Sequence, residues 1–296
     1  MKPIIFSLFD ETGLTKTISQ RCGYEIGELT IHQFPDEETL VKINTDVKGR
    51  PLIFVATLNK PNTKILPLLF AAKTAKDRGA KSIALVAPYL AYMRQDKAFT
   101  PGEGVTSRYF AELLSENFDW LTTVDPHLHR WSSLNQIYSI PTELIHAGKP
   151  ITEWIKQNVN QPLIIGPDQE SEQWIAAIAQ SINAPYVIAQ KTRNGDRDVS
   201  VSIPQLEKYP QHSPVLIDDI ISTGKTLLSA IQILQKAKMP APICIGIHAV
   251  FAGDAYTELL KSGIQEVITC NTIHHPSNGI DLNSAIADIV KKSIEL

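Results

Sequence analysis

Hydrophobic and polar positions alternate along this chain in a repeating order of short apolar runs and longer amphipathic segments. The apolar runs Pro51–Val55 and Ser82–Ala87 have the length of buried strands. Segments of about 10 to 15 residues, such as residues 64–78 and Lys225–Lys236, place apolar side chains at helical spacing. Strands and helices that alternate in this way are typical of parallel sheets covered by helices on both faces. The pattern therefore predicts an α/β fold.

The order of elements in the first half returns about 160 positions later. Each half contains a strand, a helix, a short strand, a polar turn and a further strand. The short strand is expected at residues 28–31 in the first half and at residues 185–189 in the second. The polar turns fall at residues 34–38 and 193–196. The two halves therefore look duplicated, although generic spacing of strands and helices would give a similar order.

The length of the chain supports two domains. With 296 residues, it is long for a single hydrophobic core, and two domains of about 150 residues fit the usual size. Hydrophobic residues make up 43% of the chain, which is enough for two cores. We expect domains at residues 1–145 and 146–296, each a mainly parallel sheet flanked by helices.

Composition excludes several classes of protein. The net charge of −3, without a cluster of Lys and Arg, does not supply the surface that nucleic acid requires. The longest apolar runs, such as residues 83–87, are far shorter than the roughly 20 residues of a membrane span. The N-terminus enters a strand without a signal-peptide pattern, and the three cysteines have no metal or disulfide spacing. A reduced cytoplasm is the expected location, with neither nucleic acid nor membrane as partner.

The most informative chemistry lies at residues 215–226. An apolar strand there runs into two carboxylates and then into a Ser/Thr/Gly turn that opens a helix. Backbone N–H groups, hydroxyls and the positive end of the helix can hold a phosphate. Carboxylates at the strand end can accept hydrogen bonds from sugar hydroxyls or bind Mg²⁺. The segment predicts a ribose-phosphate site, which would use Asp218, Asp219, Ser222, Thr223, Gly224, Lys225 and Thr226.

Two other interpretations of this segment are weaker. Its end, Gly224-Lys225-Thr226, resembles a Walker A motif, but that motif needs glycine five positions before Gly224, where Asp219 stands. A carboxylate there would face the phosphates. A strand and helix without any ligand would leave two acids unpaired at the end of an apolar strand, which is unfavourable.

Five further blocks complete the pattern, and ligands of parallel sheets bind in the loops that follow the strands. Phe-Pro-Asp-Glu-Glu-Thr occupies residues 34–39, Pro-Tyr-Leu-Ala-Tyr-Met-Arg-Gln-Asp residues 88–96, and Val-Asp-Pro-His residues 124–127. Asp168 follows the next strand, and a Lys-Thr-Arg block begins at Lys191. Together with residues 215–226, these blocks resemble, in order, those of the ribose-phosphate pyrophosphokinases, that is, the phosphoribosyl diphosphate (PRPP) synthetases.

The resemblance covers essentially the whole chain, and residues 92–103 look closest to the shorter archaeal-type enzymes. The loop at residues 215–226 is also similar to that of type I phosphoribosyltransferases. The resemblance implies two tandem phosphoribosyltransferase-type domains. It also implies a ribose-phosphate diphosphokinase, which transfers the β,γ-diphosphoryl group of MgATP to the C1 hydroxyl of ribose 5-phosphate and releases AMP. The ATP-binding elements would belong to the N-terminal domain, and the ribose 5-phosphate site and catalytic loop to the C-terminal domain.

The resemblance also implies a role for each block. Lys191 and Arg193 would close over the transferring group as catalytic residues. His127 would hold Mg²⁺ on the ATP phosphates, with Asp168 near the metal. The family completes its adenine pocket from a neighbouring subunit, so a homo-oligomer built from dimers is expected. The ATP-binding residues would be Phe34, Asp36, Glu38, Arg94 and Gln95.

Structural alternatives stay open for several of these residues. Phe34 could be plain core, and Arg94 could form a surface ion pair with Asp96. His129 competes with His127 as the metal ligand, although His127 is favoured because it lies two residues after Asp125, as in the family. We expect His129 and the adjacent Arg130 to be helix-capping or solvent residues. Lys191 and Arg193 could form a solvated turn, and His274-His275 is interpreted as loop.

Two departures from the family pattern concern the ribose-phosphate site. Glu170-Ser171 stands where small residues are common, and Lys225 replaces a small residue. Neither removes a catalytic group. Two other functions stay open, a phosphoribosyltransferase that consumes PRPP and a catalytically silent regulatory subunit of PRPP synthetase. The first would need neither Arg94-Gln95 nor a duplicated domain, and the second would be favoured by the loss of catalytic residues that this chain retains.

Overall fold

The chain forms two α/β units. The computed structural model describes residues 2–194 and 198–295, and the side chains of residues 191–201 and 294–295 lie outside the description. One unit comprises Met1–Ile145 with Asn283–Leu296, and the other comprises His146–Leu282. The last helix thus belongs with the first unit, whereas an uninterrupted domain at residues 146–296 was expected. Among the described residues, none of the helices combines the length and the apolar composition that a membrane span needs.

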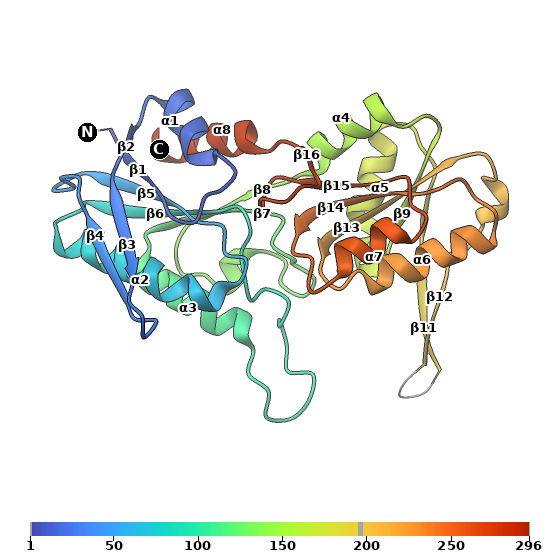
Figure 1. Ribbon diagram of the computed structural model, residues 1–296, viewed down its shortest axis with the longest axis horizontal. Coiled ribbons are helices and arrows are strands. Elements are labelled where there is room, and N and C mark those ends of the chain that lie inside the picture. Colours follow the sequence, from blue (N-terminus) through green and yellow to red (C-terminus); the bar gives the residue numbers. More distant parts are fainter. Residues whose placement is uncertain (1, 195–197, 296) are drawn as a thin grey trace. The chain divides into compact units, whose positions relative to one another are not determined.

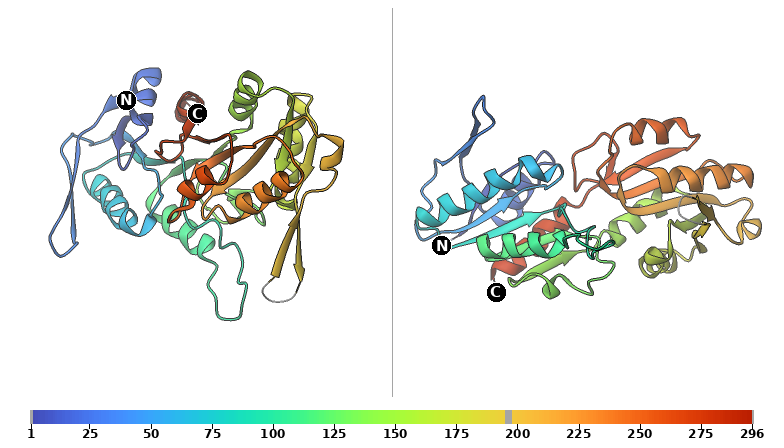
Figure 2. Two further views of the ribbon diagram at one scale, coloured as in Figure 1. Left: turned by 45° about the vertical axis from the view of Figure 1, so that its right-hand side comes forward. Right: turned by 90° about the horizontal axis from the view of Figure 1, so that it is seen from below.

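The first unit is built on a six-stranded sheet in the order β2-β1-β5-β6-β7-β8, in which all neighbours are parallel. Helices α1 and α8 cover one face, and α2 and α3 cover the other (Figures 1 and 2). Strands β3 and β4 form a separate antiparallel hairpin. The elements are β1 (Ile4–Ser7), α1 (Leu14–Cys22), β2 (Glu25–Ile26), β3 (Leu29–Gln33), β4 (Thr39–Ile43), β5 (Pro51–Val55), the 3₁₀ turn Pro61–Thr63, α2 (Ile65–Asp77), β6 (Ser82–Ala87), α3 (Thr106–Asn117), β7 (Trp120–Val124), the 3₁₀ turn Leu134–Gln136, β8 (Thr142–Ile145) and α8 (Asn283–Glu295).

The second unit has a six-stranded parallel sheet in the order β10-β9-β13-β14-β15-β16. Helices α4 and α5 lie on one face, and α6 and α7 lie on the other (Figure 1). Strands β11 and β12 form an antiparallel hairpin. The elements are α4 (Gly148–Asn158), β9 (Pro162–Gly166), the 3₁₀ turn Gln169–Ser171, α5 (Glu172–Ser181), β10 (Tyr186–Ile188), β11 (Gln190–Asn194), β12 (Asp198–Ser202), the 3₁₀ turn Leu206–Lys208, β13 (Ser213–Ile221), α6 (Lys225–Lys236), β14 (Ile243–Ala249), α7 (Ala255–Lys261), β15 (Glu266–Cys270) and β16 (Asn278–Ile280).

The two units share one topology, which confirms the duplicated α/β plan. In each sheet the second strand lies at an edge and pairs with the first strand. Along the sequence, an antiparallel hairpin comes between these two strands and the remaining strands of the sheet. One expected equivalence is wrong. The strand of the first unit that is equivalent to β10 is the edge strand β2, which pairs with β1. The strand expected near residues 28–31 is instead the first arm of the hairpin. The sequence gives no apolar signal for β2 because both of its residues are exposed.

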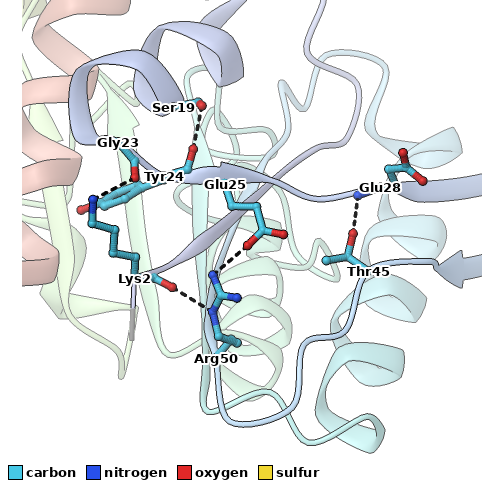
Figure 3. Close-up of polar contacts among 8 residues, drawn as sticks. All are labelled: Lys2, Ser19, Gly23, Tyr24, Glu25, Glu28, Thr45 and Arg50. Carbon is cyan, nitrogen blue, oxygen red and sulfur yellow. Dashed lines mark hydrogen bonds and ion pairs between the residues drawn. The ribbon is translucent and has the colours of Figure 1, made fainter.

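Polar contacts fasten this edge strand to the unit (Figure 3). The Arg50 guanidinium donates to the Glu25 carboxylate at 3.0 Å and to the backbone carbonyl of Lys2 at 3.0 Å. The Ser19 hydroxyl donates to the carbonyl of Tyr24 at 2.7 Å. Charge-assisted and backbone-directed hydrogen bonds therefore hold a strand that is too short to be fixed by its own sheet pairing.

The C-terminal helix α8 completes the first unit by packing on α1 and β8, as α4 packs on α5 and β16 in the second unit. Ile286 and Val290 are buried there, with 1% and 0% exposure. Asn283 donates to the carbonyl of Thr12 at 3.1 Å, and the thiol of Cys22 lies 3.7 Å from the carbonyl of Ala287. The first unit thus depends on residues from the far end of the chain.

This packing predicts that Ile286→Ala destabilises the first unit. Truncation of a fully buried Ile costs about 2–5 kcal/mol, because apolar contacts are lost and a cavity remains. Urea unfolding should show this loss, and the half-buried thiol of Cys22 should react faster with a disulfide reagent. Lys291→Ala, an exposed change on the same helix, serves as the control. Equal stability losses in the two variants would contradict the prediction.

Candidate functional site

The carboxyl end of β13 presents two half-buried carboxylates at the sheet edge of the second unit. Asp218 pairs in register with Gly246 of the neighbouring strand β14. Asp219 accepts a hydrogen bond from the backbone N–H of Ile220 at 2.7 Å. Burial, with the negative charge of Asp218, raises the pKa of the Cys244 thiol to about 12. The carboxylates of Asp218 and Asp219 therefore directly follow the buried apolar run of residues 214–217 within β13, as the sequence predicted.

The turn after β13 leads directly into the start of α6. Gly224 has a φ of 68°, a left-handed conformation that favours glycine, and α6 begins at the next residue. The carbonyls of Ile221 and Ser222 accept hydrogen bonds from Phe251 and Ala252 at 2.8 and 3.0 Å, which fix the turn to the segment after β14. The helix N-terminus adds N–H groups and a partial positive charge. Thr223 and Lys225 are exposed, and Ser222 and Thr226 are half-buried.

Asp168 stands at the same edge of this unit. It follows β9, which pairs with β13, and it is half-buried in an extended conformation. The Ser171 hydroxyl donates to its carbonyl at 2.6 Å and stabilises the short turn at this point. Glu170 is exposed on that turn. The second unit therefore places Asp168, Asp218 and Asp219 at the ends of the adjacent strands β9 and β13, next to the turn that opens α6.

The two expected catalytic cations lie on the hairpin of the second unit. Lys191 and Arg193 belong to β11, and their backbones pair with Val201 and Val199 of β12. Their side chains lie outside the described residues. Their backbone therefore forms a hairpin arm, in the position that β3 has in the first unit.

The hairpin of the first unit carries the expected adenine-binding residues at its tip. Phe34 is 41% exposed, and Asp36 and Glu38 are exposed. The tip is closed by a hydrogen bond from the N–H of Phe34 to the carbonyl of Glu38 at 2.8 Å. The ring of His32 meets that of Phe34 edge-on, with centroids 4.8 Å apart. The alternative that Phe34 is plain core is therefore wrong, because its ring is available for stacking.

The loop after β6 is anchored by an ion pair that the sequence did not predict. Arg94 is exposed and Gln95 is half-buried, whereas the Asp96 side chain is only 1% exposed. Nη1 of Arg130 donates to both Asp96 oxygens, at 2.9 and 3.1 Å. The expected solvent or capping role of Arg130 is therefore wrong, and so is the pairing of Arg94 with Asp96. The order of the strands could have predicted the Arg130–Asp96 pair, because β6 and β7 are parallel neighbours and the loops that follow them begin at the same edge of the sheet.

The loop after β7 brings two histidines together in the same unit. The Nε2 atom of His129 lies 3.0 Å from Nδ1 of His127, and the ring centroids are 3.9 Å apart. Asp125 and His127 have positive φ values of 28° and 52°. The expectation that His129 is a solvent or capping residue is thus wrong, because its ring meets His127.

The equivalent edge of the first unit has no counterpart of the two acids of β13. Residues 56–58, which follow β5, are buried Ala, Thr and Leu. Asp10 follows β1 as Asp168 follows β9, but its carboxylate accepts hydrogen bonds from the N–H groups of Thr12 and Thr15 at 3.0 and 2.7 Å. Burial alone would raise the pKa of Asp10, but these hydrogen bonds outweigh burial and lower it. This acid therefore secures the start of α1.

Comparison with known proteins identifies both units. The family model of the N-terminal domain of ribose phosphate pyrophosphokinase matches residues 3–117, and that of the phosphoribosyl transferase domain matches residues 133–285. A ribose-phosphate pyrophosphokinase of Saccharolobus solfataricus is 28% identical and covers 93% of this chain and 96% of its own. One from Methanopyrus kandleri is 25% identical, with coverage of 97% and 98%. A phosphoribosylpyrophosphate synthetase structure from Mycobacterium smegmatis has a TM-score of 0.88 at 22% identity, with coverage of 100% and 99%, and shows the same fold.

The buried ion pair predicts a large and specific loss of stability in Arg130→Met. The change leaves the Asp96 carboxylate buried without its cation, which costs about 3 kcal/mol, the lower end of the range for such pairs because Arg130 is 39% exposed. Asp96→Asn in the same protein should restore part of the loss. Arg21→Met removes a pair that is 45% and 55% exposed, and should cost less than about 1 kcal/mol. Denaturant unfolding of the wild type, Arg130→Met, Asp96→Asn and the double variant measures the coupling, and additive effects of the two changes would refute it.

Proposed function

The chain belongs to the ribose-phosphate pyrophosphokinase family, and we propose that it forms PRPP and AMP from ATP and ribose 5-phosphate. In this reaction the C1 hydroxyl oxygen attacks the β-phosphorus of ATP, the hydroxyl proton is lost, and the bridging oxygen leaves with AMP. The observation that carries the proposal is the sheet edge of the second unit. Two carboxylates meet a hydroxyl-lined turn at a helix N-terminus there, which suits one sugar and one phosphate.

Ribose 5-phosphate is assigned to the second unit. The 5-phosphate would accept hydrogen bonds from the backbone N–H groups and hydroxyls of the turn at Ser222, Thr223, Gly224 and Thr226. The ribose hydroxyls would donate to Asp218 and Asp219. Lys225 is exposed at the first position of α6, where its charge adds to the attraction for an anion.

ATP is assigned to elements of the first unit. Phe34 would stack on the adenine while Asp36 and Glu38 accept from its amino edge, and Arg94 with Gln95 would bind the nucleotide. We propose that residues 1–145 carry these elements and that the sugar-phosphate site belongs to the second unit. An exposed hairpin tip is suited to reach a neighbouring molecule, so the enzyme is proposed to be a homo-oligomer built from dimers. Sedimentation at assay concentration tests this, since an active monomer would contradict it.

The donor atoms of the chain fit a divalent cation. Carboxylate oxygens are the ligands that Mg²⁺ prefers, and Asp168 presents a half-buried carboxylate at the edge described above. The imidazole of His127 would contribute a nitrogen. When bound, Mg²⁺ neutralises charge on the diphosphoryl group. Asp168 and His127 would hold it.

Lys191 and Arg193 are proposed to stabilise the charge that spreads over the transferred oxygens in the transition state. Phosphoryl transfer leaves little covalent chemistry to the protein, so positioning and cationic stabilisation supply most of the rate. Closure of the hairpin β11–β12 over the group would also exclude water. The retention of both cations with His127 and Asp219 argues against a silent subunit, and the ATP-binding block argues against a phosphoribosyltransferase.

The first functional prediction concerns the products. AMP should form only when ATP, a divalent cation and ribose 5-phosphate are all present, because the sugar hydroxyl is the acceptor. Chromatography of the nucleotides and enzymatic detection of PRPP measure this. Formation of ADP, or turnover of a free nucleobase with PRPP, would refute the assignment.

The second functional prediction concerns the hairpin cations. Lys191→Ala and Arg193→Ala should each lower kcat by about 10² or more while ATP affinity stays within a few-fold, since the lost interaction forms mainly in the transition state. Lys236→Ala, an exposed change at the end of α6, should leave kcat unaltered. Steady-state kinetics checks both variants. A near-normal kcat with a large rise in KM alone would show that the loop only collects substrate.

A further inference from the structure

The two histidines after β7 form an arrangement that one imidazole alone would not need. We propose that His127 and His129 together form a two-imidazole site for a divalent cation in the first unit, with His129 as a protein ligand in its own right. The inference deepens the proposed function, on which it rests for the role of the bound ion. It also changes the chemistry of the site, because a second nitrogen donor alters which cation binds best.

The distance between the two ring nitrogens fits shared coordination. Metal–imidazole bonds measure about 2.1 Å, and two such bonds that meet at a right angle place their nitrogens about 3.0 Å apart. The Nδ1 atom of His127 and the Nε2 atom of His129 are 3.0 Å apart. The ring planes lie at 72° to each other, so the rings meet edge to face and are not stacked. The pair therefore has the spacing of two adjacent ligands of a six-coordinate ion.

The backbone that produces this spacing is strained. His127 has a φ of 52°, a left-handed conformation that costs a residue with a Cβ about 1–3 kcal/mol. Tight turns, in which the N–H of His127 reaches the carbonyl of Asp125 at 2.9 Å and that of His129 reaches the carbonyl of His127 at 3.2 Å, bring the rings together. Residues in this conformation cluster at ligand sites, and this chain also has them at turns such as those of Lys60 and Gln205, so the geometry of the two rings carries the inference.

The ion pair of Arg130 fixes the far end of the same segment. Arg130 directly follows His129, and its Nη1 atom donates to both oxygens of the buried carboxylate of Asp96. The adjacent Trp131 donates from Nε1 to the hydroxyl of Ser107 at 3.4 Å. His129 is thus held between a strained turn and two anchored residues, which limits the entropy that it loses when it binds an ion.

A simple hydrogen bond between the imidazoles is the competing explanation. In that case one ring donates its N–H to the other, and the pair needs no cation. The two explanations differ in whether His129 contributes to the binding of a cation. Imidazole ligands favour Co²⁺, Ni²⁺ and Zn²⁺ over Mg²⁺, whereas sites built from oxygen donors favour Mg²⁺. A two-imidazole site should therefore bind Co²⁺ more tightly than Mg²⁺ without nucleotide.

The test is the titration of the untagged full-length protein with Co²⁺ alone, followed by visible absorption and calorimetry. Loss of even an outer partner weakens metal binding by about 10–100-fold, so His129→Gln and His127→Gln should each weaken Co²⁺ binding by at least about tenfold. His212→Gln, a change at the amino end of β13, should leave the affinity within about twofold. Co²⁺ affinity that is unchanged in His129→Gln would overturn the proposal.

Proton NMR of the Co²⁺ form counts the ligands directly. Two strongly shifted, exchangeable imidazole N–H signals are expected in the wild type and one in each variant. A single signal in the wild type would overturn the proposal even if the His129 variant folds poorly. The measurement uses no substrate, so two signals in a protein that forms no PRPP would refute the proposed function and leave the cation site intact.

Discussion

Burial of both faces of a parallel sheet is the constraint on which the rest of this molecule depends. Helices cover each sheet on both sides, so the strands must be apolar along nearly their whole length. Most polar groups then stand where the strands end, and the buried exceptions inside strands, such as Thr122 and Thr269, are uncharged. All neighbours in each sheet are parallel, so these ends meet at a single edge. Asp219 near the end of β13 and His127 after β7 are both products of this rule, which concentrates the chemistry of each unit at one edge of its sheet.

The duplication shows how one backbone plan supports two different uses. The same topology leads to the acids of β13 in one unit and to buried neutral residues after β5 in the other. Asp10 and Asp168 stand at equivalent ends, yet the carboxylate of Asp10 is engaged by the backbone N–H groups at the start of α1. Topology thus fixes where a side chain can act, and the hydrogen bonds that surround it decide whether it holds structure or is presented to a ligand.

Local periodicity accounts for the parts of the fold that the sequence predicted well. The bounds of β5, β6 and α6 match the apolar pattern to the residue, and the edge with Asp218 and Gly224 was found because its motif is contiguous. The failures involve contacts between distant segments. The two exposed residues of β2 give no apolar signal, and the Arg130–Asp96 pair depends on which loops are neighbours. Asp125 and His127 are residue types that adopt positive φ more often than most, but the local pattern does not show that these turns bring the ring of His129 to that of His127.

The place of α8 has a consequence for the order in which this protein is made. A ribosome delivers the strands of the first unit early, but the helix that packs on α1 and β8 emerges only after the whole second unit. N-terminal domains commonly fold while the rest of the chain is still being synthesised. This one has to wait with an uncovered apolar face until the second unit has been made. Loss of Asn283–Leu296 would therefore harm the unit made first, and chaperones must shield that unit while the second one is synthesised.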